Sequence, residues 1–296
     1  MFRRTNCFLP NRGQEDRCKM KYASKMLAML CVSLLVAATA QASTYSTYVG
    51  NQTNLIAYYQ FEEQSGTTVD NAEGTAGYDG TTDIPLPADS IAGARTADGW
   101  GGLGTTNNAF DFGATANTEV TLTTALATAC DDSSLTFSAM IKLNSTSNNT
   151  WIFDTGTSIT NSITIHRWNQ LLYVGVNGGQ TKTYSSSSIN DLKWHHLTVV
   201  RDGTTSADVA LYVDGVAITQ GAGGNTTHNS GLPTIGALAG GGNYWFNGGL
   251  DEVALFSDAM TSTEVTSLYN KAVPEPATMS LLGIGGLLAL VRRRRK

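Results

Sequence analysis

Hydrophobic and polar residues alternate in a series of short segments between residues 55 and 256. Each segment is five to nine residues long and is bounded by residues that favour turns, mainly Gly, Asn, Asp, Ser and Thr. An alternation with a period of two is typical of strands that bury one face. The segments are residues 55–61, 109–113, 119–124, 135–143, 151–156, 162–168, 171–176, 194–202, 208–215 and 250–256.

Helical periodicity is nearly absent from the same region, so the pattern predicts an all-β, antiparallel, two-sheet jelly-roll sandwich. Asn-Gly at 177–178 and Asp-Gly at 214–215 tolerate the positive φ of type I′ hairpin turns. One short helix is predicted over residues 261–270. Thr261 can cap it, and Glu264, three residues later, completes a capping box.

Residues 1–42 have the order of a secretory signal peptide. A basic stretch precedes an uninterrupted apolar run, and the small residues Ala40 and Ala42 mark a cleavage position. The part before the apolar run is long for such a peptide, so Met20 and Met26 are alternative starts. We expect a helix in this segment and its removal on export.

The chain ends in a three-part segment, residues 272–296. A Pro-Glu-Pro sequence precedes an apolar run of fifteen residues, 277–291, and a terminal cluster of cations. As a helix this run would be about 22 Å long, shorter than the roughly 30 Å hydrocarbon core of a bilayer, which favours a temporary anchor over a permanent one. The residues that define the segment are Pro274, Glu275, Pro276, Arg292, Arg293, Arg294 and Arg295.

This terminal segment resembles the PEP-CTERM sorting signal of bacteria. The resemblance implies a hydrophobic helix that holds the chain in the membrane and processing near Pro274–Pro276 by an exosortase. It also implies export to the cell surface or to an exopolysaccharide matrix. The predicted organisation is therefore a signal peptide at 1–42, a linker at 43–53, one domain at 54–271 and a sorting segment at 272–296.

Removal of the two ends changes the charge of the protein. Twelve of the 19 Lys and Arg residues lie in the terminal segments, but only three of the 24 acidic residues do, so seven cations and 21 acids remain. The resulting formal charge near −14 repels nucleic acid and anionic lipid and suits an extracellular protein or a Ca²⁺ binder. Cys130 is the only cysteine left, so no internal disulfide can form.

Five segments in order resemble the laminin G-like, concanavalin A-like jelly-roll family: residues 55–82, 135–143, 194–203, 210–218 and 246–269. The last is the most specific, because it combines Gly-Leu-Asp-Glu-Val, an aromatic residue and a capped helix. The resemblance implies two packed antiparallel sheets whose first and last strands are neighbours. Since this fold carries lectins, hydrolases, lyases and adhesive modules, function has to come from individual residues.

The acidic residues do not form an arrangement typical of glycosidases. Glu62-Glu63, Asp131-Asp132 and Asp251-Glu252 are adjacent pairs, and adjacent strand residues point to opposite faces. The same reasoning applies to His195 and His196, which we interpret as packing residues with satisfied imidazoles. Motifs of serine hydrolases, zinc proteases and phosphate-binding loops are absent from the sequence. We therefore predict no catalytic residue.

A structural Ca²⁺ ion is one candidate ligand. Asp70 and Asp79 lie in a Gly-rich loop after the first strand, and Asp251 begins the last strand. Carboxylate and carbonyl oxygens from loops are the ligands that Ca²⁺ prefers. In proteins that this chain resembles, the opening loop and the closing strand approach each other. The alternative is that these acids only form turns and solvate the surface.

Glycan is the other candidate ligand. Tyr244 and Trp245 in a Gly-rich loop are the predicted contacts, although aromatic residues of a sandwich more often fill the core.

The sequence thus predicts an exported surface or matrix protein that binds glycan or adheres, without catalysis. Its expected partners are an extracellular polysaccharide, the exosortase and the secretion machinery, and not nucleic acid. A carbohydrate-active enzyme and a purely structural or protein-adhesive module are the alternatives.

Overall fold

A computed structural model describes residues 44–273 except 87–89, 114–117, 147–148, 157–160, 178–179, 222–223, 226–230 and 241–243. The predicted signal peptide with Ala40 and Ala42 lies outside the described residues. So do Pro274, Glu275, Pro276, Arg292, Arg293, Arg294, Arg295 and the two predicted terminal helices. Within the described part of the chain, no helix is long and apolar enough to cross a membrane.

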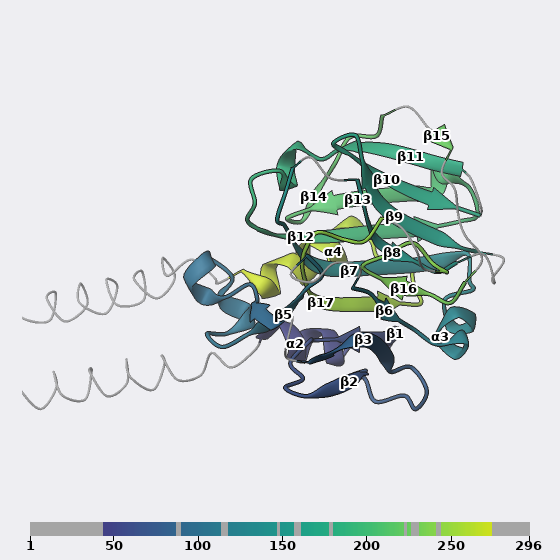
Figure 1. Ribbon diagram of the computed structural model, residues 1–296. Coiled ribbons are helices and arrows are strands. Elements are labelled where there is room, and N and C mark those ends of the chain that lie inside the picture. The colour runs from purple at the N-terminus through teal and green to yellow at the C-terminus, as the bar shows by residue number, and fades with distance from the viewer. Residues whose placement is uncertain are drawn as a thin grey trace, which may run out of the picture. The chain divides into compact units, whose positions relative to one another are not determined.

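The strands form two antiparallel sheets, as the sequence predicts (Figure 1). Sheet A has the order β14 (Val216–Ala217), β13 (Val209–Val213), β12 (Trp194–Asp202), β7 (Ser134–Leu143), β17 (Gly248–Phe256), β5 (Asn108–Asp111) and β4 (Ser90–Ala92), and β1 (Leu55–Tyr59) also pairs with β17. Sheet B has the order β15 (Gly224–Asn225), β11 (Gln180–Ser185), β10 (Leu171–Val176), β9 (Ile163–Trp168), β8 (Thr150–Asp154), β16 (Thr234–Ile235), β6 (Val120–Thr121), β3 (Gly80–Leu86) and β2 (Gly66–Val69).

The main core lies between the two sheets. Alternate residues of β7, β9, β10 and β13 point into it, and Phe137 of β7 stacks on Phe153 of β8 with ring centroids 5.0 Å apart. Both side chains are fully buried, and each such burial contributes about 1.5–3 kcal/mol to stability. The alternation that predicts the strands therefore also predicts which residues join the sheets.

A second apolar cluster covers the outer face of sheet A. It joins residues of β1, β7, β12 and β17 to two helices, α2 (Thr44–Gly50) and α4 (Ser262–Ala272). Helix α4 begins as predicted, because Thr261 caps it and Glu264 completes the capping box. The remaining helices are short: α3 (Thr124–Ala129), η1 (Thr96–Asp98), η2 (Gly101–Leu103), η3 (Ser187–Ile189) and η4 (Ser206–Asp208).

Helix α2 differs from the linker that the sequence predicts at 43–53. Tyr45 and Val49 of this helix are fully buried, and the Tyr45 hydroxyl lies 3.2 Å from Nε2 of His196. The helix has only seven residues and too few apolar positions to show periodicity. It is stabilised by tertiary packing, which a local pattern cannot predict. These residues belong to the folded domain.

The predicted Asp-Gly hairpin is present between β13 and β14. Asp214 and Gly215 have φ values of 52° and 72°, and Val213 pairs with Val216. A second hairpin of this kind joins β9 to β10, where Asn169 and Gln170 have φ values of 47° and 62°. The second turn was not predicted, because Asn-Gln lacks the glycine that usually identifies such turns.

The imidazoles of the two adjacent histidines of β12 have hydrogen-bond partners, as the sequence predicts. His196 is fully buried, Ser138 lies 2.9 Å from its Nε2, and burial lowers its pKa to about 4. His195 lies between Asp214 at Nδ1 and Asp191 at Nε2, both at 2.8 Å. Burial alone would lower the pKa of His195, but the hydrogen bonds to the two carboxylates raise it. Protonated His195 therefore stabilises the fold below its ordinary pKa of about 6.5, and this contribution is lost as pH rises through the raised value.

Removal of the Tyr45 side chain tests whether α2 belongs to the domain. We expect Tyr45→Ala to lower the free energy of unfolding of the full chain by about 3 kcal/mol, because it leaves a cavity in the second cluster. Urea denaturation followed by tryptophan fluorescence measures the change. Thr47→Ala, on the exposed side of the same helix, is the matched control and should change stability by less than about 0.5 kcal/mol. Equal effects of the two substitutions would contradict this placement.

The environment of His195 gives a second prediction. We expect Asp191→Asn to lower the pKa of His195, since the neutral amide stabilises the imidazolium less than the carboxylate does. An NMR titration of the imidazole Cε1–H measures the pKa. Asp202→Asn, at the other end of β12 from His195, should leave the pKa of His195 unchanged. An unaltered pKa in Asp191→Asn would show that this carboxylate does not hold the proton on His195.

Candidate functional site

Aromatic side chains form a row across the outer face of sheet B. Trp151 of β8 pairs in register with His166 of β9, which pairs with Tyr173 of β10. The Trp151 and His166 rings stack with centroids 4.3 Å apart and planes 11° apart, and His166 and Tyr173 stack at 5.0 Å and 15°. None of the three belongs to the core between the sheets. The row therefore extends over three neighbouring strands on the face turned away from sheet A.

The predicted residues Tyr244 and Trp245 lie at one end of this row. Tyr244 stacks on Trp151 with centroids 4.8 Å apart and meets Trp168 edge-on at 5.3 Å. Its side chain is 42% exposed, whereas Trp245 is partly buried. The backbone fixes this loop to the sheet, because Trp151 N–H donates to the Tyr244 carbonyl at 2.9 Å and Thr150 Oγ1 donates to the Trp245 carbonyl at 2.9 Å. The loop thus extends the row instead of filling the core.

Two carboxyl groups lie beside these aromatic residues. Thr82 of β3 pairs with Val120 of β6, and both are buried, so the neighbouring Asp83 and Glu119 lie on the outer face. Trp245 donates a hydrogen bond to Glu119. Burial raises the pKa of the Glu119 carboxyl, and the nearby Asp83 carboxylate raises it further.

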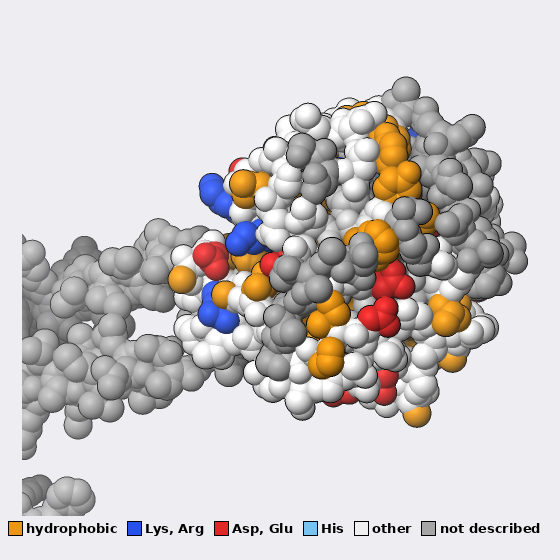
Figure 2. Space-filling model, viewed as in Figure 1, with side chains coloured by type: hydrophobic (Ala, Val, Ile, Leu, Met, Phe, Trp, Pro, Cys, Tyr) orange, Lys and Arg blue, Asp and Glu red, His pale blue; other side chains and the backbone are white. Residues whose placement is uncertain are grey.

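We name this surface the aromatic face; it comprises Trp151, His166, Trp168, Tyr173, Tyr244, Trp245, Asp83 and Glu119. On the side in view, hydrophobic side chains lie in a broken row over strands β8 to β11, with acidic side chains beside them (Figure 2). Sequence reasoning identified only the loop residues. Trp151, His166, Trp168 and Tyr173 recur at outward positions of β8, β9 and β10, which is the pattern that could have predicted the rest.

A second candidate site lies where β17 changes partners. β5 pairs with Gly249 and Leu250, and β1 pairs only from Val253 onward, so this edge of β17 is unpaired at Asp251 and Glu252. On the other edge the register with β7 shifts between Asp251 and Ala254, and Glu252 has a φ of 53°. This is a β-bulge, which redirects side chains locally.

The bulge alters the directions of the adjacent Asp251 and Glu252 side chains, which the sequence predicts to point to opposite faces. Asp251 is fully buried and accepts a hydrogen bond from Nδ2 of Asn107, while Glu252 lines a cavity together with Asn107. Tyr45 lies close to both carboxyl groups. Strict alternation to opposite faces therefore does not hold at this pair, because the extra residue of the bulge interrupts it.

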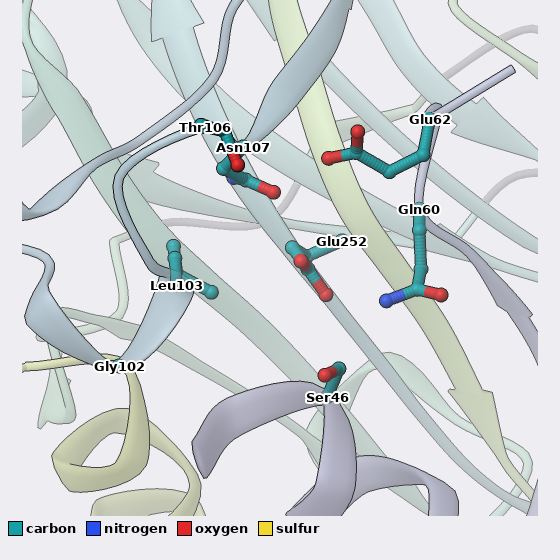
Figure 3. Close-up of a pocket in the computed structure, with 8 residues that line it drawn as sticks. All are labelled: Ser46, Gln60, Glu62, Gly102, Leu103, Thr106, Asn107 and Glu252. Atoms are coloured by element: carbon teal, nitrogen blue, oxygen red, sulfur yellow. The ribbon is translucent and has the colours of Figure 1, made fainter. Parts of the chain in front are cut away.

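The cavity has a volume of about 160 Å³ and is lined by polar groups from four separate segments. The Glu252 carboxyl lies at its centre, and Glu62 and Ser46 point toward the same space (Figure 3). Burial raises the pKa of Glu252 to about 8. Burial also raises the pKa of Asp251 well above its ordinary range, although the bond from Asn107 opposes this. The lining residues are Ser46, Gln60, Glu62, Gly102, Leu103, Thr106, Asn107 and Glu252.

The three predicted Ca²⁺ ligands differ in their exposure. Asp70 is exposed, and Asp79 is exposed with Oδ1 accepting the backbone N–H of Asn71 at 2.9 Å, whereas Asp251 is buried in β17. Within the described residues, no group of three or more His, Cys, Asp or Glu side chains is arranged to hold a metal ion. The proposed set of Asp70, Asp79 and Asp251 stays a prediction. Glu252, Glu62 and Asn107 were not predicted, because the register of β17 is not apparent in the sequence.

Comparison with solved structures finds chains that are similar over about three quarters of this one. A Trypanosoma rangeli sialidase in complex with 2,3-difluorosialic acid is 12% identical with a TM-score of 0.49, and the match covers 74% of this chain and 33% of that one. The binding domain of Paraclostridial mosquitocidal protein 1 is 15% identical with a TM-score of 0.46, over 73% and 52% of the two chains. This chain thus spans about a third of the sialidase and about half of the second structure.

Domain 4 of an extracellular arabinanase from Geobacillus stearothermophilus, in complex with arabinotriose, is 17% identical with a TM-score of 0.49. The match covers 73% of this chain and 98% of that domain. No curated protein matches the chain significantly.

Two family models match the sequence. The model of the concanavalin A-like lectin/glucanases superfamily matches residues 113–266, just over half of the chain, and the model of the PEP-CTERM protein-sorting motif matches residues 272–296. The second match indicates an exported protein that is sorted to the cell surface. The fold itself is shared by enzymes and binding modules. The chain thus belongs to the concanavalin A-like lectin/glucanases superfamily and ends in a PEP-CTERM protein-sorting motif.

Proposed function

We propose that this exported protein binds neutral glycan chains on the aromatic face and acts as a surface or matrix module without catalysis. The observation that carries the proposal is the row of outward aromatic residues on sheet B, which ends at the exposed Tyr244. Trp151 and His166 are buried and their ring faces are covered by their neighbours, so they support the rings at the margin of the row. The exposed Tyr244 and the partly buried Trp168 and Tyr173 are the rings whose apolar faces can stack on the C–H face of a sugar.

Polar groups beside the rings supply the hydrogen bonds that a glycan needs. The carboxylates of Asp83 and Glu119 can accept hydrogen bonds from hydroxyl groups, and they lie on the same face as Trp245. The domain has a formal charge near −14, which disfavours anionic polysaccharides through long-range repulsion. This is why a neutral glycan is proposed. The sorting segment would hold the chain in the membrane until an exosortase cleaves near Pro274–Pro276.

Substitution of aromatic residues tests this function. We expect Tyr244→Ala and Trp168→Ala each to weaken binding of the full chain to a neutral polysaccharide at least tenfold, because each removes a ring face at the end of the row. Affinity electrophoresis in gels that contain individual polysaccharides measures the change. Leu192→Ala is the control. Leu192 is an exposed apolar residue that precedes β12 of sheet A, so this variant should bind like the wild type. Absence of retardation by any polysaccharide in a broad bacterial and algal panel would favour a structural or protein-adhesive role.

Asp83 and Glu119 give one specific reason to consider glycoside hydrolysis. Two carboxyl groups near each other, one with a raised pKa, are what an acid and a base or nucleophile require. Asp83 belongs to β3 and Glu119 directly precedes β6, so the two are far apart in sequence and no local pattern could reveal them as a pair.

If the protein is a hydrolase, Glu119→Gln should abolish release of reducing sugar from a polysaccharide that the wild type cleaves, while binding in the gel assay persists. Glu73→Gln, at an exposed residue of the loop between β2 and β3, should retain full activity. A wild-type protein that binds a polysaccharide and releases no reducing sugar from it would exclude hydrolysis of that glycan.

A further inference from the structure

We propose that a second cavity, which we name the Lys142 cavity, binds the carboxylate group of an acidic sugar unit such as a hexuronic acid. It lies among β7, the start of β12, the segment from η1 to η2, the β13–β14 hairpin and α4, and its volume is about 600 Å³, within the range of pockets that hold small ligands. It is separate from the aromatic face, and the proposal does not depend on glycan binding there. It is lined by residues that include Trp100, Lys142, Leu192, Trp194, His195 and Tyr269.

The side chain of Lys142 carries the proposal. It lies between Ile141 and Leu143 of β7, which belong to the core between the sheets, so it points to the outer face of sheet A. The side chain is partly buried, and its neighbours in register are Trp194 and Gly249, neither of which can form an ion pair. Within the described residues Lys142 has no ion-pair partner. An anionic group of a ligand would stabilise this ammonium.

Two tryptophan side chains add hydrogen-bond donors to the same wall. Trp100 and Trp194 are 7% and 6% exposed. Neither indole N–H donates to another described residue, and neither nitrogen is among the fully shielded atoms that lack a partner. Each N–H is therefore reached from the solvent, and an indole N–H can only donate. The Trp194 ring extends over Gly249 of β17, where an added Cβ would lie 2.7 Å from Cη2, and this packing fixes its position.

The carboxylates beside the cavity are already engaged by neighbouring groups. Asp191 and Asp214 each lie 2.8 Å from one ring nitrogen of His195. Asp191 also lies 3.4 Å from Nζ of Lys193, and Asp214 accepts the backbone N–H of His196 at 2.9 Å. The ammonium and the two indole N–H groups described above are thus donors without a described acceptor. Their complement is an anionic oxygen group, because hydrogen bonds to a charged acceptor are the stronger kind.

The remaining wall suits a sugar ring better than a small inorganic anion. Leu192 is 45% exposed, and the ring of Tyr269 is partly buried and meets Trp100 edge-on with centroids 5.9 Å apart. Leu192 and Tyr269 both offer apolar surface to the C–H face of a sugar. Asp98 is exposed, and its carboxylate can accept hydrogen bonds from hydroxyl groups. An inorganic anion would occupy only a small part of the cavity and use none of these groups.

The negative charge of the domain is compatible with this binding. The domain has seven Lys and Arg residues, and Arg167 and Arg201 among them are fully buried. Two of the other five, Lys142 and Lys193, line the Lys142 cavity. Repulsion by distant acids is screened within about 8 Å at physiological ionic strength. A carboxylate at the Lys142 ammonium therefore interacts mainly with the groups that line the cavity.

Affinity electrophoresis of the full chain in gels that contain polygalacturonate, alginate or glucuronan tests the site. The wild type should be retarded by at least one of these polymers of uronic acids. Lys142→Gln should weaken that binding at least tenfold, because it removes the cation, whereas Lys142→Arg should retain most of the binding. Lys182→Gln is the matched control, since it removes one positive charge from β11 of sheet B; it should bind like the wild type.

A second variant tests the indole donor without removing a charge. Trp194→Phe keeps a ring over Gly249 and lacks the N–H. We expect it to weaken polyuronate binding roughly threefold to tenfold, as loss of one hydrogen bond does. Thermal unfolding of the same variant shows whether the domain is still folded.

The affinity for a polyuronate should also fall as the pH rises from 6 to 9. Burial opposes protonation of His195, but hydrogen bonds to Asp214 and Asp191 raise its pKa above the ordinary value. Loss of this proton leaves the two carboxylates uncompensated, and they then repel a ligand that stays ionised over the whole range. The other titratable groups that line the cavity are Asp98, Lys142, Lys193 and Tyr269.

Two results would overturn the proposal. One is a wild-type chain that none of the three polymers retards. The other is equal weakening by Lys142→Gln and Lys182→Gln, which would show attraction to the overall charge instead of a site. The aromatic face is tested separately, because Tyr244→Ala should leave polyuronate binding unchanged and Lys142→Gln should leave retardation by a neutral polysaccharide unchanged.

Discussion

Strand β17 is the element on which the rest of the domain depends. It lies in the middle of sheet A, pairs with β7 along one edge, and on its other edge pairs first with β5 and then with β1. The first strand of the domain, β1, and the last, β17, are therefore joined directly by hydrogen bonds. All nine of its residues are buried. The bulge at Asp251 and Glu252 lies where β5 gives way to β1, so the register shift with β7 coincides with the change of partner.

The two outer faces of the sandwich are used differently. The outer face of sheet A is covered by α2 and α4, which bury Met140, Trp194 and Phe256 beneath them. The outer face of sheet B has no described helix packed across its aromatic row and keeps Tyr244 exposed. Aromatic residues thus lie beneath helices on one side, whereas on the other they include the buried Trp151 and His166 and end at the exposed Tyr244. What distinguishes them is the presence of covering helices.

The strands with one apolar face could be predicted from the sequence, and so could α4, because alternation and capping are local properties. Strands β3 and β11 could not, since they are rich in Thr and Ser and β3 contains Pro85. The same limit applies to the sites. Tyr244 and Trp245 stood out in a Gly-rich loop, but the approach of Asp83 to Glu119 depends on which strands pair, and the exposure of Glu252 to the cavity depends on a bulge. Both are properties of register, which a single sequence does not contain.

The contact between α2 and α4 also determines how the domain is presented. Helix α2 begins at Thr44, directly after the predicted signal peptide, and α4 ends at Ala272, directly before the sorting motif. Both helices pack on sheet A. The last described residue, Val273, therefore leaves the domain on the sheet A side of the sandwich. The aromatic face belongs to the opposite layer, so the exit of the chain and the proposed contact with neutral glycan lie on different sheets.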